Sequence, residues 1–190
     1  MKRHIRQLLL VALLCSAAPC AAASGEDEAS IAVDDSAPPT LFGGTVTRDG
    51  LHLQATFGWA VGADAQGLFH AMELGYTLDD GGTVTYLYTL LQSKGFGPPG
   101  GGPDRLEGHL LALKLPLHFP ELVAKVAVGV EVIHGPGGHS EQGIGWLYGV
   151  DLHLPIGERS GFTVGVTANH ATTKGYQHWS LAVAGGYTCF

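Results

Sequence analysis

Apolar side chains recur at every second position through eight successive segments of this chain, between residues 51 and 184. In the first segment, LHLQATFGWAV (51–61), the odd positions are apolar and the even positions are polar or small. Successive side chains of a β-strand point to opposite faces, so a period of two predicts strands with one apolar face. In the third segment, Leu87 and Leu91 blur this pattern. The other seven segments are 71–78, 84–91, 111–119, 125–132, 145–154, 162–169 and 179–184.

Alternating segments of roughly ten residues, separated by turn residues, are typical of the strands of a transmembrane barrel. We therefore predict an all-β fold, an antiparallel up-and-down transmembrane β-barrel of about eight strands, in residues 44–190. No apolar run after residue 23 reaches the roughly 18–20 residues that a membrane-spanning helix needs. The alternative is a soluble exported ligand binder of lipocalin-like shape, whose strands would also alternate but with the apolar face inside.

Three features favour the membrane barrel over the soluble one. The second face consists mostly of Gly, Ala, Thr, Ser and His, whereas a soluble exterior carries roughly 25–35% charged residues. The predicted connections alternate in length, as in outer-membrane barrels: they are longer near 62–67, 92–106, 134–143 and 170–178, and shorter near 79–82, 120–121 and 156–160. Aromatic residues lie toward the segment ends on the apolar face, where the two membrane interfaces would fall. These interfacial aromatics are Trp59, Tyr76, Phe119, Trp146, Phe162 and Trp179.

The first 23 residues have the pattern of an export signal. A basic start precedes the apolar run QLLLVALLC, and the small residues that follow suit cleavage before Ser24. Residues 24–43 contain five acids and read as a flexible acidic leader. Loss of the signal would remove three positive charges from a net −7 and leave −10, which argues against a nucleic-acid partner. It would also leave a single cysteine, Cys189.

With its signal, strand number, loop pattern and terminal Phe190, the region 44–190 resembles the small eight-stranded outer-membrane proteins of Gram-negative bacteria, of the OmpA-domain or OmpX type. The resemblance implies a monomeric barrel in outer-membrane lipid, with Phe190 serving recognition by the barrel-assembly machinery. A β-bulge at Gly185–Gly186 would reset the register so that Phe190 faces lipid; without one, Phe190 faces away. The expected role is non-enzymatic, either structural in the envelope or in surface interactions. We expect no cofactor.

Charged residues also occur on the face predicted to point into the barrel. In a narrow barrel such groups are costly unless they are paired, so we predict an interior polar network. Eight strands leave little open space, so a pore is not expected. The network residues are Glu73, Lys114, Lys125, Glu131 and Asp151.

Several histidines fall toward one predicted end of the barrel, and imidazole is a common ligand for Zn and Cu. A metal site formed by His134, His139, His170 and His178 is therefore a hypothesis. No cysteine accompanies these histidines and their spacing is loose, so the competing interpretation is that they are polar side chains at the barrel rim.

The stretch NHATT (169–173) resembles the His-x-Ser-Asn motif of the PagL-like lipid A deacylases, which are also eight-stranded barrels. The resemblance implies His170 as general base and Thr172 as nucleophile, in a triad-like mechanism that needs an orienting carboxylate. Thr replaces both Ser and Asn of that motif, and no Asp or Glu follows Glu158. Deacylation is therefore the alternative to the non-enzymatic role.

Overall fold

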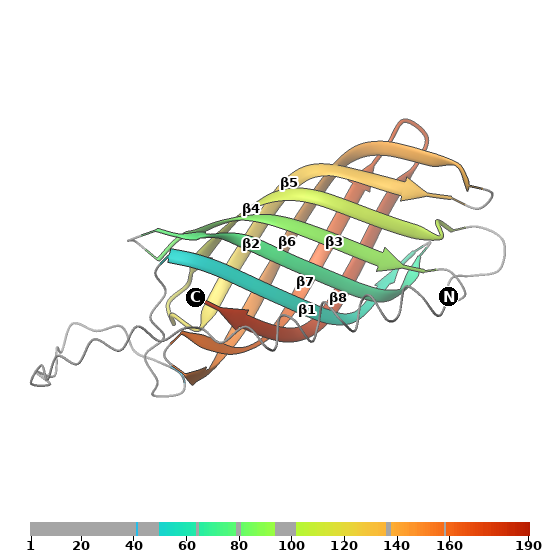
Figure 1. The fold of residues 1–190 in the computed structure, drawn as a ribbon. Coiled ribbons are helices and arrows are strands. Elements are labelled where there is room, and N and C mark those ends of the chain that lie inside the picture. Colours follow the sequence, from blue (N-terminus) through green and yellow to red (C-terminus); the bar gives the residue numbers. More distant parts are fainter. Residues whose placement is uncertain are drawn as a thin grey trace, which may run out of the picture. The chain divides into compact units, whose positions relative to one another are not determined.

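The computed structural model describes residues 41, 50–63, 65–78, 81–93, 102–135, 138–157 and 159–190. They form a closed barrel of eight antiparallel strands in sequence order, with β8 paired to β1 (Figure 1). The predicted eight-stranded up-and-down barrel is therefore confirmed. The predicted signal and, apart from Leu41, the predicted leader lie outside the described residues. The strands are β1 (Gly50–Gly62), β2 (Gln66–Thr77), β3 (Thr83–Gln92), β4 (Arg105–Pro116), β5 (Leu122–His134), β6 (Ser140–Gly157), β7 (Ser160–Thr172) and β8 (Gln177–Cys189).

The connections define two ends of the barrel. At the loop end, the strands are joined by residues 63–65, 93–104, 135–139 and 173–176; at the turn end, they are joined by 78–82, 117–121 and 158–159. Only the connection 93–104 is markedly long, so the predicted alternation in length is wrong for the other loops. The strand pairing continues into the predicted loops, as in the pair His134↔Ser140, because a backbone ladder can extend beyond the apolar part of a strand.

The alternation of side chains matches the two faces of the wall. Large apolar side chains point outward and are exposed along every strand, as for Leu51 and Leu53 on β1. Leu87 and Leu91, which blurred the third segment, point inward and are buried. Within the described part of the chain, no helix is long and apolar enough to span a membrane.

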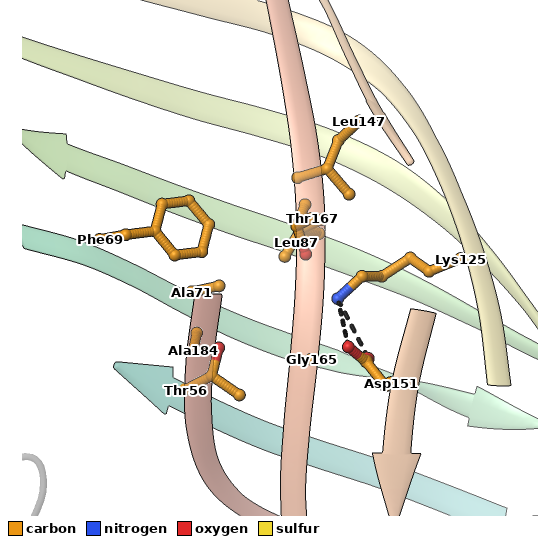
Figure 2. Close-up of a pocket in the computed structure, with 10 residues that line it drawn as sticks. All are labelled: Thr56, Phe69, Ala71, Leu87, Lys125, Leu147, Asp151, Gly165, Thr167 and Ala184. Carbon is orange, nitrogen blue, oxygen red and sulfur yellow. Dashed lines mark hydrogen bonds and ion pairs between the residues drawn. The ribbon is translucent and has the colours of Figure 1, made fainter. Parts of the chain in front are cut away.

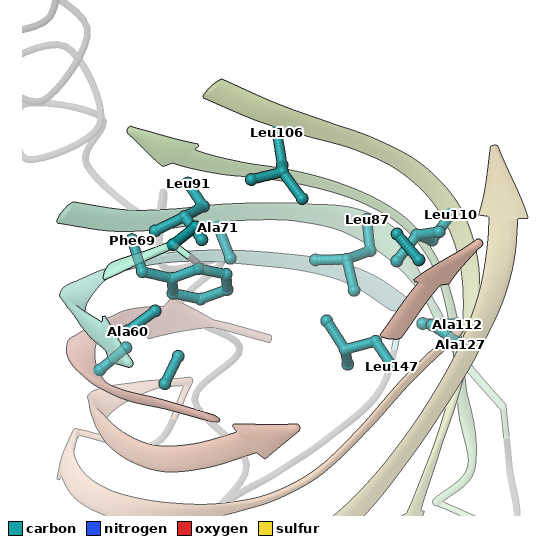
Figure 3. Close-up of a cluster of buried hydrophobic side chains, with 14 of the residues drawn as sticks. Ala60, Phe69, Ala71, Leu87, Leu91, Leu106, Leu110, Ala112, Ala127 and Leu147 are labelled. Carbon is teal, nitrogen blue, oxygen red and sulfur yellow. The ribbon is translucent and has the colours of Figure 1, made fainter. Parts of the chain in front are cut away.

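The interior toward the loop end is filled by buried apolar side chains, shown in Figure 3. Small residues such as Ala60 and Ala71 alternate with larger ones such as Phe69, Leu87 and Leu147. A narrow barrel can be filled completely in this way, because small residues on one strand leave room for large ones on another.

The seam between β1 and β8 closes the barrel, and its pairing runs from Leu53↔Cys189 to Gly62↔Ser180. At Gly186, an added Cβ would overlap the carbonyl oxygen of Ala55 on β1. Glycine at this position lets the two strands approach closely, so it is a requirement of the closed wall.

Candidate functional site

Five buried polar side chains meet inside the barrel toward the turn end, one from each of five strands. We call them the ion layer: Gln54 on β1, Glu73 on β2, Lys114 on β4, Lys125 on β5 and Asp151 on β6. Lys114 Nζ donates to Glu73 Oε2 at 2.9 Å and to Gln54 Oε1 at 2.8 Å. Lys125 Nζ donates to Glu73 Oε1 at 3.0 Å and to Asp151 Oδ2 at 3.1 Å. The last contact is drawn in Figure 2.

The ion layer contains two ammonium groups and two carboxylates, so its formal charges cancel. Lys114 Nζ also lies 3.4 Å from Asp151 Oδ2, so both lysines contact both acids. Burying a charge is expensive unless it is paired and hydrogen-bonded, and here each charged group has at least two partners. The layer therefore fills the turn-end half of the interior without an uncompensated charge.

A cavity of about 10 Å³ lies between the ion layer and the apolar filling, lined by residues that include Lys125, Asp151, Leu87 and Leu147 (Figure 2). A cavity needs roughly 10–15 Å³ to hold one water molecule, so this space is at the limit for a single water. It is too small to hold a ligand.

Glu131, the fifth charged residue predicted inside, lies apart from the ion layer. Its side chain is fully buried nearer the loop end, and its Oε1 accepts a hydrogen bond from Asn169 Nδ2 at 2.7 Å. The structure thus brings four of the predicted network residues together and gives the fifth a different partner on β7.

Phe190 packs inside the mouth at the turn end. The residue is 8% exposed, and its ring lies 5.3 Å, centroid to centroid, from the imidazoles of both His52 and His153. The β7–β8 and β1–β8 registers run without a shift through Gly185 and Gly186, so no bulge forms there. The hypothesis of a bulge that turns Phe190 toward lipid is therefore wrong. On β8, the aromatic residue that faces outward near this end is Tyr187.

On the outer face near the loop end, His170 lies between two tryptophans. Its ring is stacked on Trp179 of β8 at 3.9 Å and on Trp146 of β6 at 5.3 Å, with interplanar angles of 16° and 15°. The strand register places these three residues side by side on consecutive strands. His170 Nε2 lies 3.2 Å from Thr172 Oγ1, so the two residues of the deacylase hypothesis are within hydrogen-bond distance.

A carboxylate that could orient His170 is missing from this arrangement among the described residues. The nearby Glu141 accepts a hydrogen bond from Thr173 at 2.6 Å. The Glu141 carboxylate is thus hydrogen-bonded to Thr173, the residue after Thr172, and not to the imidazole of His170. The geometry therefore supplies a His–Thr pair without the third member of a triad.

The four histidines of the metal hypothesis are not brought together. His170 faces outward, whereas His178 is fully buried inside the barrel. His134 contacts Ser140 at 2.8 Å, and His139 lies in the connection that precedes β6. Within the described ranges, no group of three or more His, Cys, Asp or Glu residues is arranged to hold a metal ion.

The aromatic residues predicted at the interfaces lie near both ends of the wall. Trp59, Trp146 and Trp179 lie toward the loop end, and Trp179 is 51% exposed. Tyr76 and Phe162 lie on the outer face toward the turn end. Phe119 lies in the connection between β4 and β5, with its ring edge-on to His118.

Some polar partners were not predicted from the sequence. Gln54 in the ion layer, Asn169 beside Glu131 and Tyr86, whose hydroxyl lies 2.6 Å from His109 Nδ1, were all missed. The period of two places both Gln54 and Asn169 on the inward face. Their partners depend on the register between strands.

No protein-family model matches the chain, and no curated protein matches it. Among solved structures, the chain is similar to the one titled "Crystal structure of Neisserial surface protein A (NspA)". The match has a TM-score of 0.53 and 15% sequence identity, and covers 74% of this chain and 96% of that chain. At this identity the likeness concerns the fold alone.

Proposed function

We propose that the chain is an integral barrel of the outer membrane of a Gram-negative bacterium, with a non-enzymatic role in envelope structure or surface interaction. The observation that carries this proposal is the inverted polarity of the wall. Large apolar residues are exposed on the outside, while Glu73, Lys114 and Lys125 are buried inside. Such a surface suits lipid, because contiguous exposed apolar area on this scale is rare on soluble monomers.

An asymmetry of the outer face and the long connection 93–104 support a proposed orientation of the barrel. Toward the turn end, its side chains are mainly apolar or aromatic, such as Leu51, Leu115 and Phe162. Toward the loop end, many of the outward-facing positions are polar. They include Gln66, His70, Gln92, Arg105, Glu107, His109, His134, Gln142, His170, Thr172 and Gln177. Longer loops of outer-membrane barrels are extracellular. In the proposed orientation, the loop end with its connection 93–104 faces outward.

The closed interior favours a role for the surface rather than for transport. The ion layer and the apolar filling occupy the lumen, and the cavity between them holds at most about one water molecule. Interaction through the loop end is therefore the function that this architecture supports best. The likeness in fold to a Neisserial surface protein supports the barrel on which this role depends.

The alternatives have less support. A soluble lipocalin-like binder would place its apolar face around an internal ligand cavity, which is the reverse of the arrangement here. The deacylase rests on the contact between His170 and Thr172, but the imidazole has no carboxylate partner among the described residues.

We also propose that the barrel is monomeric in outer-membrane lipid and is inserted by the barrel-assembly machinery.

Fractionation of cells and tryptophan fluorescence test the membrane assignment together. We expect the protein in the outer-membrane fraction, with migration in detergent gels that changes on heating. All three tryptophans of the chain lie on the barrel wall toward the loop end. Lipids brominated near the headgroup should therefore quench their fluorescence more than lipids brominated at the chain ends. Recovery in the soluble periplasm, or no quenching by either lipid, would reject the proposal.

A further inference from the structure

The side chain of Glu131 crosses the inside of the wall from β5 to β7. It passes over Gly145 of β6, where an added Cβ would lie 2.6 Å from Glu131 Cγ. Its Oε1 accepts a hydrogen bond from Asn169 Nδ2 at 2.7 Å. Glycine on the intervening strand thus leaves the space in which acid and amide meet.

Two oxygen atoms of this pair have no hydrogen-bond donor. Glu131 Oε2 and Asn169 Oδ1 are both buried and both without a partner. An ionised carboxylate and an amide oxygen are acceptors only, so neither can satisfy the other while Glu131 is charged. An unsatisfied buried acceptor is costly. Two of them in one residue pair indicate that one of the two groups carries a proton and acts as a hydrogen-bond donor.

The surroundings offer Glu131 no compensating charge. The two interior lysines are engaged with Glu73 and Asp151 in the ion layer, where the charges already balance. In the register Glu131 is paired with Gly108 on β4 and Gly143 on β6. The inward positions on either side of these are Leu106, Leu110, Gly145 and Glu141, of which only Glu141 is titratable, and it is an acid that supplies no positive charge. Toward the loop end, the other inward-pointing titratable residues are His178 on β8 and Glu141 on β6, while Lys125 lies on the same strand as Glu131.

We propose that Glu131 is a neutral carboxylic acid that forms a two-hydrogen-bond pair with Asn169. In this pair, the Glu131 hydroxyl donates to Asn169 Oδ1 while Asn169 Nδ2 donates to Glu131 Oε1. Both unpartnered acceptors are then satisfied, and no buried carboxylate charge remains at Glu131. The protonated pair links β5 to β7 across the interior. Loss of the proton leaves a buried carboxylate, which draws water into the loop-end half of the barrel.

The stability of the full chain in lipid vesicles, compared with that of Glu131→Gln, tests the proposal. Gln keeps the paired geometry but takes up no proton. At pH values above the ordinary titration range of a carboxyl group, Glu131 keeps its proton in the folded wild type but loses it in the unfolded chain. The free energy of unfolding of wild type therefore falls as pH rises. The ratio of its unfolding constant to that of Glu131→Gln should rise about tenfold per pH unit between about pH 5 and pH 7. A ratio that stays flat over this range would overturn the proposal.

Infrared spectroscopy of the folded protein gives a second test that needs no unfolding. Wild type at neutral pH should show the carbonyl band of a protonated carboxylic acid, and Glu131→Gln should lack it. Glu141→Gln, which alters an exposed acid near the loop end, should retain the band. Absence of the band from the wild type would overturn the proposal. So would stabilisation by added sodium or calcium ions that Glu131→Gln loses, because a bound cation would then occupy the place of the proton.

Discussion

The Lys125 ammonium on β5 lies 3.0 Å from the Glu73 carboxylate on β2, although two strands separate β2 from β5 around the wall. Lys114 reaches the same carboxylate from β4 at 2.9 Å. The ion layer therefore ties strands together across the interior, in addition to the backbone ladder that joins neighbours.

Glu73→Gln should destabilise the barrel strongly, because it leaves two buried lysines with Asp151 as their only carboxylate in the ion layer. Breaking a buried ion pair by removing one partner costs about 3–5 kcal/mol. We expect a loss of this size in the free energy of unfolding, measured by urea titration in lipid vesicles. The exposed-site control Glu141→Gln should change it by less than about 0.5 kcal/mol. Equal effects of both variants would contradict the ion layer.

Gly186→Ala should prevent closure of the seam, because the added methyl group would overlap the Ala55 carbonyl oxygen. Gly185→Ala is a matched control in the next position, since its Cβ would lie 3.6 Å from the nearest heavy atom, the Thr163 carbonyl oxygen. The fraction of protein that refolds in detergent, read from its heat-dependent gel migration, should fall sharply for Gly186→Ala and stay near wild type for Gly185→Ala. Normal refolding of both would show that the seam is looser than the structure indicates.

Phe190→Ala should lower stability by about 3 kcal/mol, because it removes a ring packed between His52 and His153. Tyr187→Ala, which removes an outward-facing ring, should cost less. Unfolding of both variants in vesicles measures this difference. If Phe190 also serves the assembly machinery, its variant should lose outer-membrane protein in cells even under conditions where the purified chain refolds. Equal stabilities of the two variants would argue against the inward position of Phe190.

Lipid A should carry the same acyl chains in cells with wild type, with His170→Ala and without the protein. The reason is that the His170–Thr172 pair lacks a carboxylate among the described residues. His170→Ala should instead lower stability by about 1 kcal/mol, through loss of the stack with Trp146 and Trp179. Mass spectrometry of lipid A from cells with wild type, with His170→Ala and without the protein provides the measurement. Loss of an acyl chain in the presence of wild type, but not of His170→Ala, would establish the deacylase.

The period of two was sufficient to predict eight strands and the outward position of most apolar residues, because alternation is a local property of the chain. It was ambiguous at Leu87 and Leu91, where the interior itself is apolar. Loop lengths were harder to predict, since pairing such as His134↔Ser140 extends past the apolar segments.

Contacts between strands distant in sequence could not be predicted, because they depend on the stagger of the whole barrel. The inward position of Glu131 followed from parity, but its pairing with Asn169 instead of a lysine required the three-dimensional register. The irregularity of the ladder lies between Pro155 and Gly157, and not at Gly185–Gly186 as the sequence had suggested. Likewise, Trp146 on β6 and Trp179 on β8 are distant from one another in sequence. The register places one on each side of His170.

The seam between β1 and β8 also has a kinetic consequence. Every other ladder joins strands that are consecutive in sequence and can form as a hairpin, whereas this ladder joins the two ends of the barrel region. The seam therefore carries the largest loop-closure entropy and has no local nucleus of its own. Closure of this one ladder is the step at which an open, curved sheet with two unsatisfied edges becomes a wall without edges, as the proposed membrane location requires.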